Sequence, residues 1–160
     1  MKPIEEPITG DEPLTDLSQP QQALIEFYKA FNTRNLDLID QNFAATDEVV
    51  IDNPLGGIRR GSEEPRKMYK SIFQSPADVH VTFSDYTIDR AGDVFWAVGF
   101  EKGTYKEGGN THDLTIRTSR LFRLIDGRWR QVHHHGSIDD PQLLAKFQSA
   151  VRSPKPSAVA

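Results

Sequence analysis

Three consecutive histidines, His133, His134 and His135, stand in the segment WRQVHHHGS. Imidazole can bind a metal ion, accept a proton near neutral pH or simply form hydrogen bonds. Side chains alternate between the two faces of a β-strand, so we expect His133 and His135 to point together and His134 to point away. Because zinc needs three or four converging ligands, this alternation argues against a three-histidine site. We predict no metal and no cofactor, and His134 becomes the candidate catalytic base.

Arg120 is the second candidate for chemistry, because it stands on one face of an alternating segment. That face carries Ile116, Thr118, Arg120 and Phe122. A guanidinium can bind an organic anion through two parallel hydrogen bonds. It can equally form an internal salt bridge with a helix acid such as Glu26. If it lies beside His134, it should depress the pKa of the imidazole and favour the neutral, basic form.

Helical periodicity predicts the elements of the first half. Apolar residues at positions 24, 27, 28 and 31 follow helical spacing after Pro20, and a second short helix is expected within residues 35–44. The segment EVVID predicts a strand that is stopped by NPLGG. Residues 62–73 then predict a third helix.

Alternation and turn signals predict strands in the second half. Turns are expected at residues 91–93, 108–110 and 126–127, where Asp-Gly is a strong hairpin signal. A closing helix follows Asp139 or Asp140, with Pro141 in its first turn. Strands joined by short turns form an antiparallel meander, so we predict an α+β domain with the helices on one face of the sheet.

Composition sets the domain bounds and excludes several functions. Residues 1–19 predict a mobile acidic, proline-rich arm, residues 20–151 a single domain and residues 152–160 a frayed tail. The net charge of −4 argues against a nucleic-acid binder, and the lack of cysteine excludes disulfides and thiolate chemistry. No apolar run approaches the roughly 20 residues of a membrane span, and no secretory signal is visible. We expect a cytoplasmic protein without nucleic-acid or membrane partners.

The order α-α-β-α-β-β-β-β resembles that of the nuclear transport factor two-like superfamily. FYKAFNTRNLDLIDQNFA resembles its opening helices, and DNPLGGIRRG resembles its first strand and turn. SRLFRLIDGRWRQVHHHGS is the most specific match. It resembles SnoaL-like domains and the association domain of calcium/calmodulin-dependent kinase. The resemblance covers roughly residues 20–150.

This resemblance implies a cone in which a strongly bent antiparallel sheet wraps around the N-terminal helices. A largely apolar pocket is then expected inside the cone, for a small molecule that can be anionic. The pocket residues implied by the resemblance and by strand alternation are His134, Asp52 and Arg120 as catalytic groups, and Tyr28, Asn53, Trp96, Thr118, Phe122 and Val132 as ligand contacts. A homodimer is implied through the convex face, where Trp129, Gln131, His133 and His135 are expected.

The family hosts several activities, and the residues test them unequally. Resemblance to the ketosteroid isomerases places their base at Asn53 and their tyrosine at Phe27, so that chemistry is disfavoured unless the alignment slips to Asp52 and Tyr28. An isomerase, cyclase or hydratase could use His134 as its base. Water activation as in the epoxide hydrolases of this fold would need Arg120 with acids such as Asp52 and Asp113. The alternative is a non-catalytic association module.

The loop NPLGGIRRG places Gly56 and Gly57 beside Arg59 and Arg60. Glycine with arginine can indicate phosphate binding, but this segment matches no phosphate-loop pattern. We interpret it as a turn with a solvated basic edge.

Overall fold

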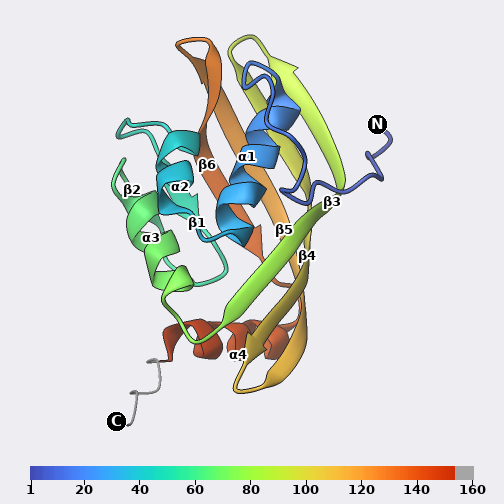
Figure 1. Cartoon of the computed structure of the whole chain (residues 1–160), viewed down its shortest axis with the longest axis vertical. Coiled ribbons are helices and arrows are strands. Elements are labelled where there is room, and N and C mark those ends of the chain that lie inside the picture. Colours follow the sequence, from blue (N-terminus) through green and yellow to red (C-terminus); the bar gives the residue numbers. More distant parts are fainter. Residues whose placement is uncertain (154–160) are drawn as a thin grey trace.

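A six-stranded sheet is the largest element of the structure, a computed structural model that describes residues 1–153 (Figure 1). The strands are β1 (Val50–Asp52), β2 (Arg59–Arg60), β3 (Asp78–Ala91), β4 (Val94–Glu107), β5 (Asn110–Ile125) and β6 (Arg128–Ser137). Their spatial order is β2-β1-β6-β5-β4-β3. The meander from β3 to β6 is antiparallel as predicted, but β1 runs parallel to β6, so the sheet is mixed. The two-residue strand β2 is an addition to the predicted order.

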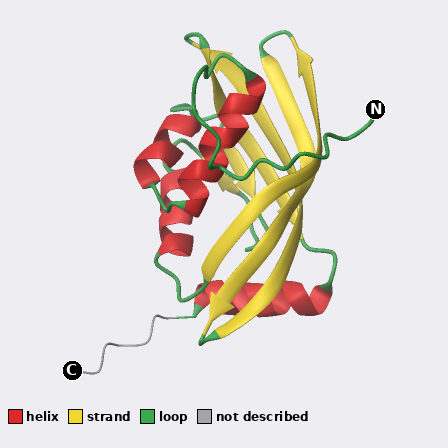
Figure 2. Ribbon diagram, turned by 45° about the vertical axis from the view of Figure 1, so that its right-hand side comes forward, coloured by secondary structure: helices red, strands yellow, loops and turns green. Residues whose placement is uncertain are grey.

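Three helices cover one face of the sheet, and a fourth crosses its end (Figure 2). They are α1 (Pro20–Asn32), α2 (Leu36–Asn42), α3 (Glu64–Phe73) and α4 (Pro141–Arg152). Pro20 and Pro141 stand in first turns, where a missing N–H costs nothing, and Asp140 accepts from the N–H groups of Gln142 and Leu143. The predicted α+β architecture is confirmed. Within residues 1–153, no helix is long and apolar enough to cross a membrane.

The sheet bends around the helices at places where β3 and β4 approach closely. The register of β3 shifts between Ser84 and Thr87. In β4, a Cβ atom added to Gly103 would lie 1.9 Å from the carbonyl oxygen of His80, and one added to Gly99 would lie 2.6 Å from the Cβ of Tyr86. Only glycine permits these approaches, and they let the sheet curve toward the helices.

A bulge in β6 changes which residues face the helices. Leu121 pairs with His133 and Phe122 with Gln131, so Val132 has no partner in β5. The extra residue shifts the alternation by one, and Trp129 is fully buried against Phe95 at 4.9 Å between ring centroids. The prediction that Trp129 and Gln131 face outward is therefore wrong, and Trp129 cannot contribute to a dimer face. Beyond the bulge, His134 is buried while His133 and His135 lie on the outer face, as the alternation predicts.

The N-terminal segment packs on the edge strand β3. Ile4 forms a bridge with Tyr86, and Ile8 forms one with Phe83 and is buried. This arrangement differs from the mobile arm expected for residues 1–19. Although the segment is acidic and rich in proline, it contains two isoleucines whose spacing lets both pair with the edge strand β3. Of the tail expected at residues 152–160, Arg152 ends α4, and residues 154–160 lie outside the described residues.

Candidate ligand-binding cavity

A small cavity, called here the inner cavity, lies between the inner face of the sheet and the helices. Its volume is about 40 Å³, which leaves room for a few water molecules in this conformation. Most of its wall is apolar and comes from α1, α3, α4 and the sheet. The side chains with polar groups are Asn53, Tyr69, Glu101, Arg120 and His134.

Arg120 projects from β5 into this wall and is only 1% exposed. Its Nη2 donates to Oε1 of Glu101 at 2.6 Å, its Nη1 to Oε1 of Gln131 at 2.7 Å and its Nε to the hydroxyl of Tyr28 at 3.2 Å. The guanidinium also lies 3.6 Å from the ring centroid of Phe27. Burial alone would lower the pKa of Arg120, but Tyr28 and Glu101 raise it above the ordinary value. Arg120 is therefore a fixed cation whose charge Glu101 already neutralises.

The hydrogen bonds of Arg120 continue into a buried polar network. Gln131 donates to Asn42 at 3.0 Å, and Asn42 donates to Glu26 at 3.0 Å. Glu26 in turn accepts from Arg128 at 2.5 and 2.7 Å. The internal salt bridge considered for Arg120 therefore exists, but its partner is Glu101, because Glu26 is taken by Arg128.

His134 lies beside Arg120 with an unused hydrogen-bonding atom. The side chain is 3% exposed, and its Nδ1 has no hydrogen-bond partner within residues 1–153. Burial, with the positive charge of Arg120 as the next cause, lowers the pKa of His134 well below 6.5. In the neutral tautomer that carries its proton on Nε2, this imidazole has an Nδ1 that can accept a proton or a hydrogen bond.

The hydroxyl of Tyr69 and the amide of Asn53 complete the polar surface. Tyr28, expected as a ligand contact, bonds to Arg120 and Glu101 but does not line the cavity. The hydroxyl of Tyr28 donates to Glu101 at 2.9 Å, and burial raises its pKa well above 10. Burial also raises the pKa of Tyr69 to about 12, so this hydroxyl keeps its proton. The Nδ2 of Asn53 lies 2.8 Å from the sulfur of Met68, and its Oδ1 accepts from the backbone N–H of Leu55. The position at which the isomerase resemblance places a carboxylate base thus carries an amide on the cavity wall.

Two of the residues expected in the pocket lie on the outer face of the sheet. Asp52 stands opposite His135, and its Oδ2 lies 2.7 Å from the Nδ1 of that histidine. Trp96 alternates with the buried Phe95 and so faces outward. Both expectations require correction: Ile51, not Asp52, carries the inward side chain of β1, and Trp96 has the wrong strand parity.

The remaining predicted contacts, Thr118, Phe122 and Val132, do not line the inner cavity. Thr118 and Phe122 are buried on the same face as Arg120, and Phe122 stacks on Phe95 at 4.5 Å. Val132 is the bulged residue. Asp113, the second acid considered for water activation, is exposed. With Asp52 outside and Asp113 in solvent, Arg120 is not flanked by the two acids that water activation would require.

Glu101 is a charged residue of the cavity wall that was not predicted. It is 6% exposed and shares one face of β4 with Phe95, Ala97 and Tyr105. An acid at an alternating apolar position was a usable signal, because a buried carboxylate needs a partner. Only the pairing of β4 with β5 shows that this partner is Arg120. Within the described chain, no group of three or more His, Cys, Asp or Glu residues could hold a metal ion.

A model of the SnoaL-like domain matches residues 21–141. The chain belongs to the SnoaL-like domain family. This match spans α1 to the start of α4, and it confirms the resemblance inferred from the motifs. A comparison with curated proteins finds no match.

Solved structures of the nuclear transport factor 2-like superfamily share the fold of this SnoaL-like chain. One is a provisionally assigned dehydratase from Streptomyces avermitilis, with a TM-score of 0.67, 17% identity and coverage of 76% of this chain and 94% of that one. Another is a ketosteroid isomerase-like protein from Erwinia carotovora atroseptica. Its TM-score is 0.64 and its identity 20%, and the match covers 78% of this chain and 97% of that one. A third is a provisionally assigned calcium/calmodulin-dependent protein kinase type II association domain from Thiobacillus denitrificans. Its TM-score is 0.60 and its identity 25%, and the match covers 81% of this chain and 100% of that one.

Proposed function

We propose that the chain binds a small, largely apolar molecule in the inner cavity and that His134 accepts a proton or hydrogen bond from it. The observation that carries this proposal is the unpartnered Nδ1 of His134 on a mostly apolar wall. Buried polar atoms normally have partners, so an unpartnered ring nitrogen on a residue that lines a cavity is a feature of binding and catalytic sites. The provisional dehydratase and the isomerase-like protein named above are consistent with acid–base chemistry in this fold.

The charges of the site favour an uncharged group at this position. Arg120 is paired with Glu101, and the lowered pKa keeps His134 neutral. An anion brought into the inner cavity would face the carboxylate of Glu101 without a free cation, which is costly at low dielectric. A hydroxyl or a carbon acid could instead present its proton to His134, while Tyr69 donates a hydrogen bond. This arrangement suits isomerisation, cyclisation or dehydration without a cofactor.

Binding of 1-octanol, a neutral apolar probe with one hydroxyl, tests this proposal. The probe is larger than the 40 Å³ of the inner cavity, so its binding requires the cavity to widen. Ile116 lines the inner cavity, so Ile116→Trp should fill it and weaken 1-octanol binding at least about tenfold, a difference of about 1.4 kcal/mol. Titration calorimetry gives the dissociation constants. Thr115→Trp, at the exposed position next to Ile116, is the matched control and should leave binding unchanged.

Nitrogen NMR of the three adjacent histidines adds a site-specific measurement. The alcohol should shift the Nδ1 resonance of His134, while His133 and His135 on the outer face should not respond. Equal affinity in Ile116→Trp and wild type, or a shift confined to His133 and His135, would contradict binding in the inner cavity.

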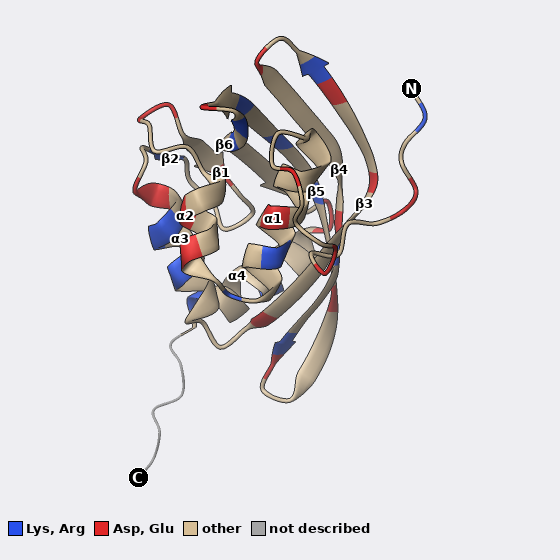
Figure 3. Cartoon of the chain, turned by 45° about the horizontal axis from the view of Figure 1, so that its top comes forward, with Lys and Arg blue, Asp and Glu red and all other residues tan. Residues whose placement is uncertain are grey.

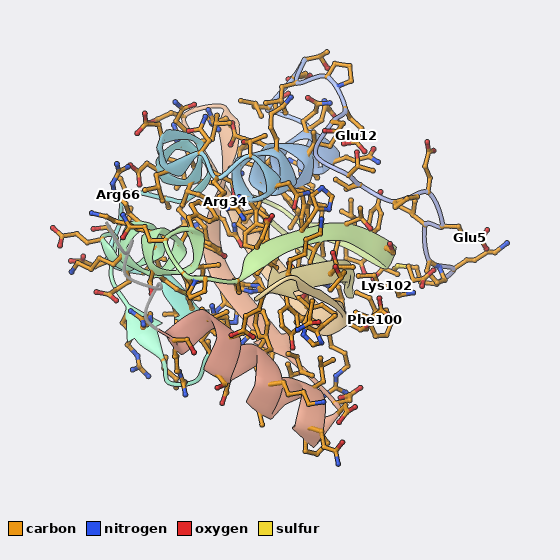
Figure 4. The ribbon with its side chains drawn as sticks, turned by 60° about the horizontal axis from the view of Figure 1, so that its bottom comes forward. Glu5, Glu12, Arg34, Arg66, Phe100 and Lys102 are labelled. Carbon is orange, nitrogen blue, oxygen red and sulfur yellow. The ribbon has the colours of Figure 1, made fainter. Side chains whose placement is uncertain are left out.

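Self-association is a second proposal, carried by the outer face of the sheet. Trp96, Val98, Phe100 and Leu121 lie there, and Val98 is 46% exposed. Figure 4 shows Phe100 and Lys102 together on β4, on the opposite side of the molecule from Arg66 of α3. An apolar patch within a polar rim is typical of an interface between subunits, and a homodimer would bury it.

We expect Val98→Glu to convert a homodimer to a monomer, because the substitution places a charge in the centre of the apolar patch. Light scattering after size exclusion measures the mass of the wild type and the variant. Thr115→Glu, an exposed position elsewhere on β5, is the control. A wild type that is already monomeric at high concentration would end this proposal without affecting the inner cavity.

A further inference from the structure

A second, larger depression lies beside the inner cavity, and its charged lining is basic. It is formed by α3, the loop after β1 and the end of α4, with a volume of about 910 Å³. Figure 3 shows blue Lys and Arg positions along α3. Its charged residues are Arg59, Lys67, Lys70 and Arg152, and none of its lining residues within 1–153 is acidic. We call this region the basic groove.

Two of these four cations have no carboxylate partner in the described part of the chain. Arg59 lies 3.5 Å from Glu64, and Lys67 lies 3.3 Å from both Glu63 and Glu64. Lys70 and Arg152 form no salt bridge with residues 1–153. The groove therefore keeps uncompensated positive charge although the chain as a whole carries −4.

The basic groove and the inner cavity share one wall residue, Leu55. The loop that carries Leu55 is held by α4, because Gln148 donates to the carbonyl of Pro54 at 2.7 Å and Arg152 donates to the carbonyl of Leu55. An anion that binds Arg152 competes with the Leu55 carbonyl for this guanidinium. Binding in the groove would thus loosen the residue that separates the two spaces, and the inner cavity could then expand beyond its 40 Å³.

We propose that the ligand is amphipathic, with an apolar end in the inner cavity and a phosphate or carboxylate at Lys70 and Arg152 in the basic groove. The inference rests on the proposed function for the apolar end. It assigns the anion to the groove because Arg120, the cation inside, is already paired with Glu101 at 2.6 Å. Guanidinium and ammonium groups at a wide, open mouth suit a hydrated anionic group, which loses little of its solvation there.

Calorimetry with octyl phosphate, 1-octanol and inorganic phosphate tests the two ends of the ligand separately. We expect octyl phosphate to bind the wild type at least about tenfold more tightly than either other probe, the gain expected from one or two charge-assisted hydrogen bonds. Lys70→Gln and Arg152→Gln should each weaken the binding of octyl phosphate about tenfold. Lys70→Gln should leave 1-octanol binding unchanged. Lys106→Gln, an exposed lysine on β4, is the matched control.

Each contrary outcome has a separate meaning. Equal binding of octyl phosphate and 1-octanol, or no effect of Lys70→Gln, would overturn the amphipathic ligand while leaving the inner cavity as a site. Inorganic phosphate that binds as tightly as octyl phosphate would show an anion site unconnected with the inner cavity and would also overturn it. Failure of 1-octanol to bind the wild type, with tight binding of inorganic phosphate, would count against the proposed function itself.

Discussion

Replacing Glu101 with alanine is expected to lower the free energy of unfolding by about 3–5 kcal/mol, the cost of breaking a buried ion pair from one side. The substitution leaves the guanidinium of Arg120 buried without a counter-charge. It also removes the acceptor for the hydroxyl of Tyr28, which donates to the same oxygen of Glu101. Chemical denaturation followed by circular dichroism measures the change.

The neighbouring strand offers a matched control for this substitution. Arg123, also on β5, pairs with Glu48 at 2.8 Å, but both side chains are about 40% exposed. Glu48→Ala should therefore cost less than about 1 kcal/mol, as for other solvent-exposed ion pairs. The double variant Glu101→Ala/Arg120→Ala should cost less than the sum of its two single changes, since no charge is left stranded. If Glu101→Ala is as mild as Glu48→Ala, the pair does not hold the inner wall together.

Local sequence signals predicted the elements of this fold but not every residue's face. Proline at helix starts, helical spacing and Asp-Gly turns act within a few residues, so they can be read without tertiary contacts. In β5, alternation separated the two faces and the family resemblance placed the face of Arg120 inward, where Arg120 is indeed buried. In β6, the bulge at Val132 reversed the faces of Trp129 and Gln131. No feature of the β6 sequence marks a bulge, because it results from pairing with β5.

The candidate site was predicted in part, for a related reason. His134 and Arg120 were found because an imidazole or a guanidinium on an inward face is rare and visible in one strand. Glu101 was missed because its importance depends on the register between β4 and β5, which sets Glu101 and Arg120 close enough to bond. Asp52 was misplaced because its face depends on a parallel pairing with β6, two segments far apart in the chain.

Below pH 6.5 the protein is expected to lose stability, and the variant His134→Gln is expected to lose much less of it than the wild type. The pKa of His134 is depressed in the folded protein, first by burial and then by Arg120, whereas the unfolded chain has the ordinary value of 6.5. Between these two values the unfolded state binds a proton that the folded state does not. Stability therefore falls as the pH decreases through this window, by up to about 1.4 kcal/mol per pH unit from this one residue.

Denaturation of the wild type and His134→Gln at intervals from about pH 7 to about pH 5 measures how much free energy of unfolding each protein loses on acidification. At about pH 5 the wild type should have lost at least about 1 kcal/mol more than His134→Gln. Thr115→Val, an exposed change on β5 that removes no titratable group, should keep the slope of the wild type. The same slope in His134→Gln would show that the imidazole becomes protonated without cost and is no neutral base. The cost arises because a second cation would join Arg120 on the inner wall, where Glu101 supplies one negative charge. The arrangement that makes protonation of His134 unfavourable is therefore the one that keeps its nitrogen free for a ligand.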